Sequence, residues 1–246
     1  MTFSELTKKY RPSLTDAECN SLNIIGERLR ETNAVMNLTA LTDEKGVGLL
    51  HFWDSLTLLD TNLFKNVSVI DVGCGGGFPS LPLALCASDC VITSNDATAK
   101  KLSYVAETAR AAGINNLKTL CGRAEELSCK GEYREQYDIA VARGVARLNV
   151  LCEWCMPFVK VGGYFVAMKG EKGEEEANEA KRAIELMDRD AIILVAVYPG
   201  HAEGDAEGKM IAEYLSTLVR FQYCATRINI LNSPTSPYFY LIEAKP

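Results

Sequence analysis

The stretch Val67–Ser80, VSVIDVGCGGGFPS, decides the fold of this chain. It opens with an apolar run rich in β-branched residues, and this run ends at glycines in positions 73, 75, 76 and 77. Such a run is typical of a buried strand in a parallel sheet. Glycines let the backbone turn tightly and approach a ligand with no Cβ in the way. A strand, a glycine turn and a helix together predict the crevice in which open α/β sheets bind ligands.

The spacing of the glycines indicates which ligand this crevice takes. The dinucleotide fingerprint G-x-G-x-x-G requires a third glycine where this chain has Phe78. The chain instead has Asp71-x-Gly73-x-Gly75-x-Gly77, which resembles motif I of the class I S-adenosylmethionine (SAM) methyltransferases. In that class the loop wraps the amino-acid end of SAM. On the glycines alone, a structural turn or a different nucleotide is an alternative.

Residues 91–96, VITSND, are predicted to form a second strand that ends on Asp96. An acidic residue at this place usually binds ribose hydroxyls, because one carboxylate can accept hydrogen bonds from both. Alternatively, Asp96 caps the helix that is expected over residues 97–112. Together with the glycine loop, the pattern favours the ribose role.

The rest of the chain predicts an α/β fold with a mostly parallel seven-stranded sheet and an N-terminal helical cap. Residues 1–64 are expected to form the cap and residues 65–246 the SAM-binding core. Within the cap, residues 1–14 are expected to be a loosely held lead-in, ahead of helices over 15–32 and 44–59. Further strands are predicted over 117–121, 137–142, 164–168, 191–197, 226–231 and 238–244. Helices are expected over 171–187 and 211–218, and an acidic, glycine-rich loop over 199–208.

Several candidate site residues follow the predicted strands. Ala124 and Glu125 come after the third strand, where the adenine lies in this class of enzyme. Arg143 ends the fourth strand and Lys169 follows the fifth. Charged residues at the carboxyl ends of such strands face the ligand crevice. For Arg143, a salt bridge at the surface is the alternative.

Composition limits the function classes. The 246-residue chain has a net charge of −6, whereas proteins that hold RNA mainly through phosphates are usually basic, so an RNA substrate would require a local basic face. The sequence has no apolar run long enough for a membrane span and no secretory signal pattern. The nine cysteines are an odd number in mostly apolar segments, which favours reduced thiols in the cytoplasm. Cys152-x-x-Cys155 is expected to be core packing, and no metal site is expected.

As a set, these residues resemble the ribosomal small-subunit RNA methyltransferase G family, also called glucose-inhibited division protein B. The resemblance implies methyl transfer from SAM to N7 of a guanine in small-subunit ribosomal RNA, with no membrane or DNA partner, by a cytoplasmic monomer. It also implies that Gly73, Phe78, Ala124, Glu125 and Arg143 contact SAM, and that Arg143 and Lys169 hold the RNA. The motifs that carry it are Asn37-Leu38-Thr39-Ala40, His51-x-x-Asp54-Ser55-Leu56, Asp71 to Pro79, Asp96 with Lys100-Lys101, Arg123-Ala124-Glu125-Glu126, Ala142-Arg143-x-Val145-Ala146 and Lys169-Gly170.

The chain departs from the family pattern at Ser80, at Ala97 and at its C-terminus, which lacks the basic T-P-x-x-Y-P-R tail. Three alternatives therefore stay open. The chain could be a SAM-binding, ribosome-associated protein without enzymatic activity, or a SAM methyltransferase that acts on a small molecule or a protein. A nicotinamide-dependent dehydrogenase is disfavoured by Phe78.

Overall fold

The computed structural model describes residues 1–169, 192–197, 223–228 and 238–244. The chain divides into two compact units, unit 1 (Met1–Arg123) and unit 2 (Ala124–Pro246), and each is described by itself. The helices expected over 171–187 and 211–218 and the loop expected over 199–208 lie outside the described residues.

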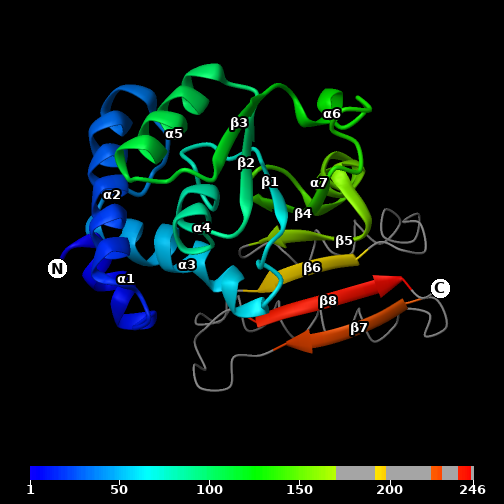
Figure 1. Ribbon diagram of the computed structural model, residues 1–246, viewed down its shortest axis with the longest axis horizontal. Helices are drawn as coiled ribbons and strands as arrows, with labels where there is room; N and C mark the ends of the chain where they lie inside the picture. The colour runs from blue at the N-terminus through cyan, green and yellow to red at the C-terminus, as the bar shows by residue number, and fades with distance from the viewer. Residues whose placement is uncertain (170–191, 198–222, 229–237, 245–246) are drawn as a thin grey trace. The chain divides into compact units, whose positions relative to one another are not determined.

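Unit 1 contains the strand that leads into the glycine loop. Its sheet has the order β3-β2-β1, and both strand pairs are parallel. The register places Asp71 opposite Ser94, so β1 and β2 end side by side, as the sequence predicted for consecutive strands of an α/β sheet. The strands are β1 (Ser68–Val72), β2 (Val91–Asp96) and β3 (Leu117–Cys121), drawn in Figure 1.

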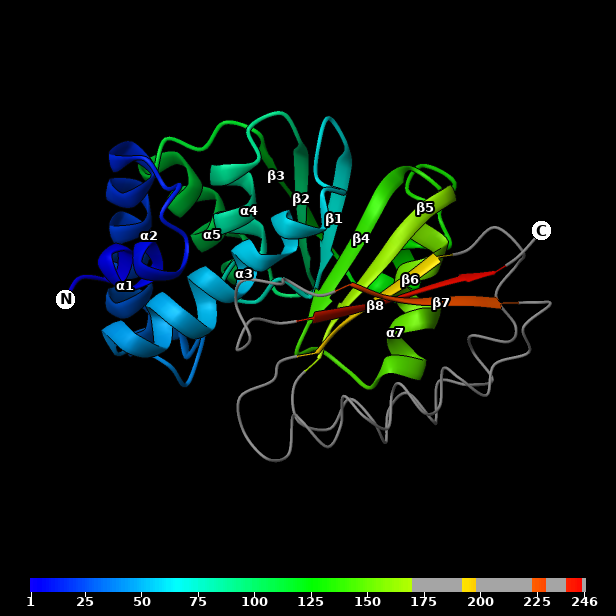
Figure 2. The same ribbon diagram turned by 90° about the horizontal axis from the view of Figure 1, so that it is seen from below.

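The helices of unit 1 form layers on this sheet. Helices α4 (Ser80–Cys86) and α5 (Ala99–Ala111) pack on the strands, and the long helix α2 (Asp16–Met36) packs on α4 and α5. Figure 2 shows α4 and α5 between α2 and the strands. Burial of apolar side chains from all three layers is the main favourable term in this packing. Completely buried members of the core include Leu22, Ile25, Leu29, Ile70, Leu81 and Ile92.

The N-terminal residues are ordered, and the expectation of a loose lead-in was wrong. Helix α1 (Phe3–Tyr10) starts with a capping box in which Thr2 and Glu5 bond each other's backbone amides. Phe3 is 2% exposed and packs on Gly26 of α2, where a Cβ would lie 2.5 Å from the Phe3 ring. The polar sequence after Phe3 hid this helix, because two of its three buried residues are the polar Ser4 and Thr7.

The helix expected over 44–59 is present, but its geometry was not predicted. It begins as a π-helix, η1 (Gly46–Trp53), and continues as α3 (Asp54–Leu56) and a 3₁₀ turn, η2 (Thr57–Thr61). π-Helical turns are rare and often lie at functional sites. Apolar periodicity cannot distinguish them from α-helix, because the two differ mainly in the hydrogen-bond register.

The described residues of unit 2 form five strands in the order β4-β5-β6-β8-β7. β4, β5 and β6 are parallel, whereas β8 runs antiparallel to both β6 and β7; the opposed arrows of β7 and β8 are visible in Figure 1. The strands are β4 (Tyr137–Arg143), β5 (Val159–Met168), β6 (Ile192–Val197), β7 (Tyr223–Ile228) and β8 (Tyr238–Ala244). The helices within residues 124–169 are α6 (Ala124–Leu127), α7 (Leu148–Cys155) and the short η3 (Met156–Phe158).

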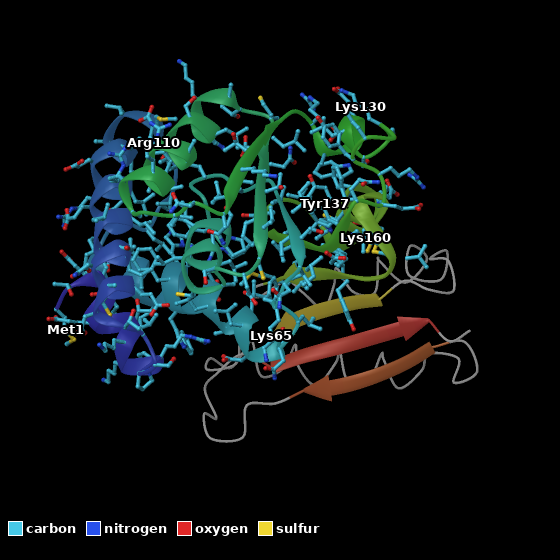
Figure 3. All side chains as sticks on the ribbon, viewed as in Figure 1. Met1, Lys65, Arg110, Lys130, Tyr137 and Lys160 are labelled. Atoms are coloured by element: carbon cyan, nitrogen blue, oxygen red, sulfur yellow. The ribbon has the colours of Figure 1, made fainter. Side chains whose placement is uncertain are left out.

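The α/β class with a mostly parallel sheet is confirmed, with three differences in detail. The described strands number eight, one for each strand segment predicted along the chain but one more than the expected seven-stranded sheet. β7 begins at Tyr223 rather than at 226. β5 begins at Val159 rather than at 164, because Gly162 at φ 77° and a register shift in the pairing with β4 let the strand continue through the two glycines. Lys160 in this added part forms an ion pair of 2.7 Å with Asp138 beside the labelled Tyr137 (Figure 3).

The Cys152-x-x-Cys155 pair lies in the buried face of α7, as predicted for core packing. Burial raises the pKa of the Cys152 thiol to about 12, so this sulfur is a poor nucleophile. In the part of the chain that the structure describes, no helix is long and apolar enough to cross a membrane, and no three potential metal ligands gather. The predicted boundary between residues 64 and 65 falls inside unit 1 and stays a prediction.

Candidate functional site

The glycine loop that follows β1 has the backbone that the sequence predicted. Gly73, Gly75 and Gly77 have φ values of 72°, 54° and 86°, which residues with a side chain rarely adopt. Gly77 is also closely packed, because a Cβ there would lie 2.5 Å from Leu81 Cδ1. At Gly75, by contrast, the nearest atom to such a Cβ is the Gly73 carbonyl oxygen at 4.0 Å. The loop is therefore tight at its end and open at its centre.

Asp96, at the end of β2, connects this loop to the neighbouring strand. Its Oδ2 accepts a hydrogen bond of 3.1 Å from the Gly75 amide, and its Oδ1 accepts one of 2.8 Å from the Thr98 amide ahead of α5. Asp96 is not the N-cap of the following helix, which is Thr98, but it holds the amide of that residue. A carboxylate has about four lone-pair sites, so these two bonds leave acceptor capacity for a ligand.

Asp71 supports the loop from within the sheet. The residue is 0% exposed, and its Oδ2 accepts a hydrogen bond of 3.1 Å from the Ser80 amide at the first position of α4. Ser80 therefore serves through its backbone, which explains why a serine is tolerated at this departure from the family pattern. A direct contact between Asp71 and a ligand stays a prediction.

Cys74 lies in the middle of the loop but is not available for covalent chemistry. Burial and the nearby Asp71 and Asp96 carboxylates raise the pKa of its thiol far above the ordinary value. The thiolate is the nucleophilic form of cysteine. The loop therefore acts through its backbone and not through this side chain.

Asn95 is a structural anchor that the sequence analysis missed. Its side-chain Nδ2 donates hydrogen bonds of 2.9 and 3.0 Å to the carbonyl oxygens of Leu120 and Gly122, and its backbone carbonyl oxygen accepts one of 2.8 Å from the Cys74 amide. The side chain is 1% exposed. An amide side chain in a predicted buried strand, directly before the candidate acid, was the signal that could have identified it.

Phe78 is less accessible than its predicted contact with SAM suggests. It is 6% exposed, and its ring stacks on the ring of His51 with centroids 4.6 Å apart and planes 14° apart. The His51 ring in turn shares a hydrogen bond of 2.9 Å with Thr39 Oγ1. Thr39 was predicted only as a motif match, and His51 as a motif match and one of two histidines that could serve as an imidazole base; the structure joins both to the glycine loop.

In unit 2, the residues after β3 lie on a short helix. Ala124 is 6% exposed and starts α6, and Glu125, half-buried, follows it. The Glu125 carbonyl oxygen accepts a hydrogen bond of 3.3 Å from the Cys129 thiol. The roles predicted for Ala124 and Glu125 at the adenine stay predictions.

Arg143 and Lys169 are brought to neighbouring strand ends. Arg143 is paired in register with Met168, the last residue of β5, and Lys169 follows at once. Lys169 is only 8% exposed, and its Nζ donates a hydrogen bond of 2.5 Å to the Ala146 carbonyl oxygen in the turn that follows Arg143. Lys169 therefore holds the turn beside Arg143, a contact that its position in the sequence did not predict.

Comparison with known proteins is consistent with this geometry. The family model described as rRNA small subunit methyltransferase G matches residues 18–198, and a second model, of an rRNA methylase family, matches residues 172–243. Relatives named Ribosomal RNA small subunit methyltransferase G occur in several bacteria. The Brevibacillus brevis protein is 42% identical, over 75% of this chain and 78% of its own. The Lactobacillus delbrueckii protein is 38% identical, over 82% and 86%.

Among solved structures, a Corynebacterium glutamicum protein matches with a TM-score of 0.47 and 14% identity, covering 99% of this chain and 97% of its own. The family assignment does not depend on that match. It follows from the model that covers residues 18–198 and from relatives about 40% identical over most of both chains. This chain belongs to the rRNA small subunit methyltransferase G family.

Proposed function

We propose that this protein is a SAM-dependent methyltransferase that transfers a methyl group to N7 of a guanine in small-subunit ribosomal RNA. Its family membership supports the reaction. The structural observation that carries the proposal is the Asp96 carboxylate, which is bonded to the Gly75 amide at the open centre of the glycine loop and keeps acceptor capacity. This is the arrangement that a nucleoside with two adjacent hydroxyls requires.

The residues of unit 1 fit the cofactor. The open space at Gly75 lets a ligand approach the backbone closely, and Gly73 lies next to it in the same left-handed conformation. SAM, when bound, supplies a methyl group made electrophilic by its positively charged sulfur. The carboxylates of Asp71 and Asp96, both within the strands that flank the loop, favour a cation nearby.

The proposed chemistry needs little from the side chains. N7 of guanine carries an available lone pair, so no proton has to be removed before it attacks. The protein's contribution is then to hold the reacting groups in line, which can be worth about 7–11 kcal/mol of the barrier. A reaction that needs no proton removed agrees with the residues around the glycine loop, where the Cys74 thiol is kept protonated by burial and no general base is evident.

The cationic residues of unit 2 are proposed to hold the RNA. Arg143 and Lys169 stand at adjacent carboxyl strand ends, and an arginine can bond a phosphate or the O6 and N7 edge of guanine with two parallel hydrogen bonds. The hydrogen bond from Lys169 to Ala146 supports a role in fixing the turn next to Arg143. The target guanine must be splayed out of its stack, at a cost of about a few kcal/mol.

We further propose that the protein acts as a monomer in the cytoplasm, where ribosomal RNA is found, and that it uses neither DNA nor a membrane. Light scattering of the purified protein would measure its mass in solution.

The test is methyl transfer to small ribosomal subunits from a strain that lacks the modification. The RNA is digested to nucleosides and analysed by mass spectrometry, with SAM carrying a labelled methyl group. We expect labelled 7-methylguanosine with the wild-type protein and a strong loss of it with Asp96→Ala. Label in a different nucleoside, or none while SAM is bound, would overturn the proposed reaction.

A further inference from the structure

The side chains of Thr39, His51 and Phe78 form a cluster at the glycine loop, in which the His51 and Phe78 rings are buried. Thr39 Oγ1 and His51 Nε2 are 2.9 Å apart, and the His51 ring stacks on the Phe78 ring at a centroid distance of 4.6 Å. His51 is 9% exposed and Phe78 is 6% exposed. The same threonine hydroxyl accepts the Leu41 amide at 3.1 Å, which fixes its position. The cluster thus joins the segment after α2 to the loop.

The π-helix η1 determines where His51 lies. Two glycines allow this helix to pack closely: a Cβ on Gly48 would lie 2.8 Å from the Phe3 carbonyl oxygen, and a Cβ on Gly46 would lie 3.0 Å from Asp43 Oδ2. The Thr7 hydroxyl donates a hydrogen bond of 2.9 Å to the Gly48 carbonyl oxygen, so α1 is tied to η1. Since a π-turn places successive side chains at different angles from an α-turn, this packing sets the direction of His51.

Phe78 transmits that position to the backbone of the loop. The amides of Gly77 and Phe78 both donate to the Cys74 carbonyl oxygen, at 2.8 and 3.1 Å, so the ring belongs to the same closed turn as the glycines. Gly76 lies against the cap as well, since a Cβ there would be 3.5 Å from Leu29 and from Leu38. One side of the loop is therefore held by the N-terminal helices, and Asp96 holds the loop through Gly75.

We propose that His51 is a positioning residue for cofactor binding: hydrogen-bonded to Thr39 and stacked on Phe78, it fixes the glycine loop in its binding conformation. His51 acts through Phe78 and contacts no reacting atom. The N-terminal helices are then part of the cofactor site's support. The identity of the ligand in this inference rests on the proposed function.

The first measurement is calorimetric binding of S-adenosylhomocysteine, which cannot undergo transfer. Thr39→Val removes the hydroxyl at nearly constant volume, and we expect the Kd to rise about 3- to 10-fold, the effect of one hydrogen bond. The control is Thr57→Val, because the Thr57 hydroxyl also makes a hydrogen bond, to the Asp54 carbonyl oxygen at 2.7 Å, and Thr57 is buried whereas Thr39 is part-buried. The control should lose similar thermal stability and keep its Kd within about twofold.

Further variants separate the two contacts of His51. His51→Phe keeps a ring to stack on Phe78 but no bond to Thr39, and His51→Gln keeps a polar group for Thr39 but no ring. Each should bind less tightly than wild type and more tightly than His51→Ala, whereas Thr39→Ser should restore wild-type affinity. Equal affinity in all of these variants would overturn the proposal.

The second measurement needs no ligand. Hydrogen exchange of the Gly77 and Phe78 amides reports opening of the turn closed on Cys74. We expect these amides to exchange faster in Thr39→Val and as in wild type in Thr57→Val; unchanged exchange in Thr39→Val would refute the positioning role. If wild-type protein failed to bind S-adenosylhomocysteine, the proposed function would fall, while this exchange comparison would still decide the role of His51.

Discussion

The glycine loop of unit 1 and the paired strand ends of unit 2 differ in what they offer a ligand. The loop offers backbone in left-handed conformations, anchored by the Asp96 and Asp71 carboxylates. The ends of β4 and β5 offer the cationic side chains of Arg143 and Lys169. A tight backbone turn with nearby negative charge suits a small cationic cofactor, and positive side chains suit a polyanion. A chain with a net charge of −6 can therefore offer both kinds of site, because the charges near each site, and not the net charge, decide what it attracts.

The largest effect should come from Gly77→Ala. The alanine would occupy a φ of 86°, which costs about 1–2 kcal/mol. Its Cβ would also overlap Leu81 at 2.5 Å, and overpacking costs about 1–3 kcal/mol more. We expect loss of S-adenosylhomocysteine binding and a lower unfolding midpoint in a denaturant titration. Gly113→Ala is the control, since its φ of 74° is similar but nothing lies within 4 Å of its Cβ; equal losses in both variants would argue against tight packing at the loop.

Asp96→Ala should weaken cofactor binding by about 10- to 100-fold, the range expected for hydrogen bonds to a charged group. Calorimetry measures the change. Asp89→Ala is the matched control, because Asp89 also accepts a backbone amide, that of Asn66 at 3.1 Å, but lies before β2 instead of at its carboxyl end. If Asp96→Ala left the cofactor affinity unchanged, Asp96 would not bind the ribose. The glycine loop would then no longer differ from the ends of β4 and β5 as the cofactor site.

Lys169→Ala should slow methyl transfer by about 10- to 100-fold while cofactor affinity stays within about twofold. The reason is that the turn after Arg143 loses the hydrogen bond at Ala146 and the strand end loses a positive charge. Single-turnover transfer to small subunits and calorimetry together measure the split. Lys160→Ala serves as the comparison, because Lys160 lies near the other end of β5 and pairs with Asp138 at the surface. If Lys169→Ala also weakened cofactor binding, the ends of β4 and β5 would contribute to the cofactor site as the glycine loop does.

Arg143→Gln should reduce the salt dependence of RNA binding. We expect a smaller change in the RNA affinity measured at a single salt concentration. For single strands, each lost phosphate contact reduces the slope of log K against log salt by about 0.7. Arg134→Gln is the control, since Arg134 is exposed and lies ahead of β4. A filter-binding series in potassium chloride measures both; equal slopes would exclude a phosphate contact at Arg143.

The smallest effect is expected at Cys152. Because burial raises the pKa of its thiol to about 12, the thiol stays protonated at pH 8 and should resist iodoacetamide in the folded protein. Labelling should increase only as the pH rises toward 12 or when the protein unfolds, and peptide mass spectrometry would follow it. Rapid labelling of Cys152 at pH 8 would mean that the face of α7 opens easily.

The C-terminal residues 172–243 differ from the rest of the chain in the family model that they match. The family model of the small-subunit methyltransferases ends at residue 198, and the second methylase model continues to residue 243. Strands β7 and β8 lie in this part of the chain. The sequence of this part does not contain the basic T-P-x-x-Y-P-R pattern of the family.

The amino-acid sequence by itself determined the strands, the glycine loop and the acid at the end of β2. These features are local: β-branched runs stop at glycine, and Asp96 follows the loop at a fixed distance along the chain. Residues 238–244 and 117–121 were likewise predicted with the bounds that β8 and β3 have.

Only the tertiary structure decided what holds these pieces in place. The packing of Phe3 on Gly26, the π-helical turn that carries His51 to Phe78, and the bond from Lys169 to Ala146 each join residues far apart in the chain. No local pattern contains such contacts, because their energy comes from burial and hydrogen bonding between segments that meet only after folding. The sequence therefore specified the chemical groups of the site, and the packing of distant segments specified their positions.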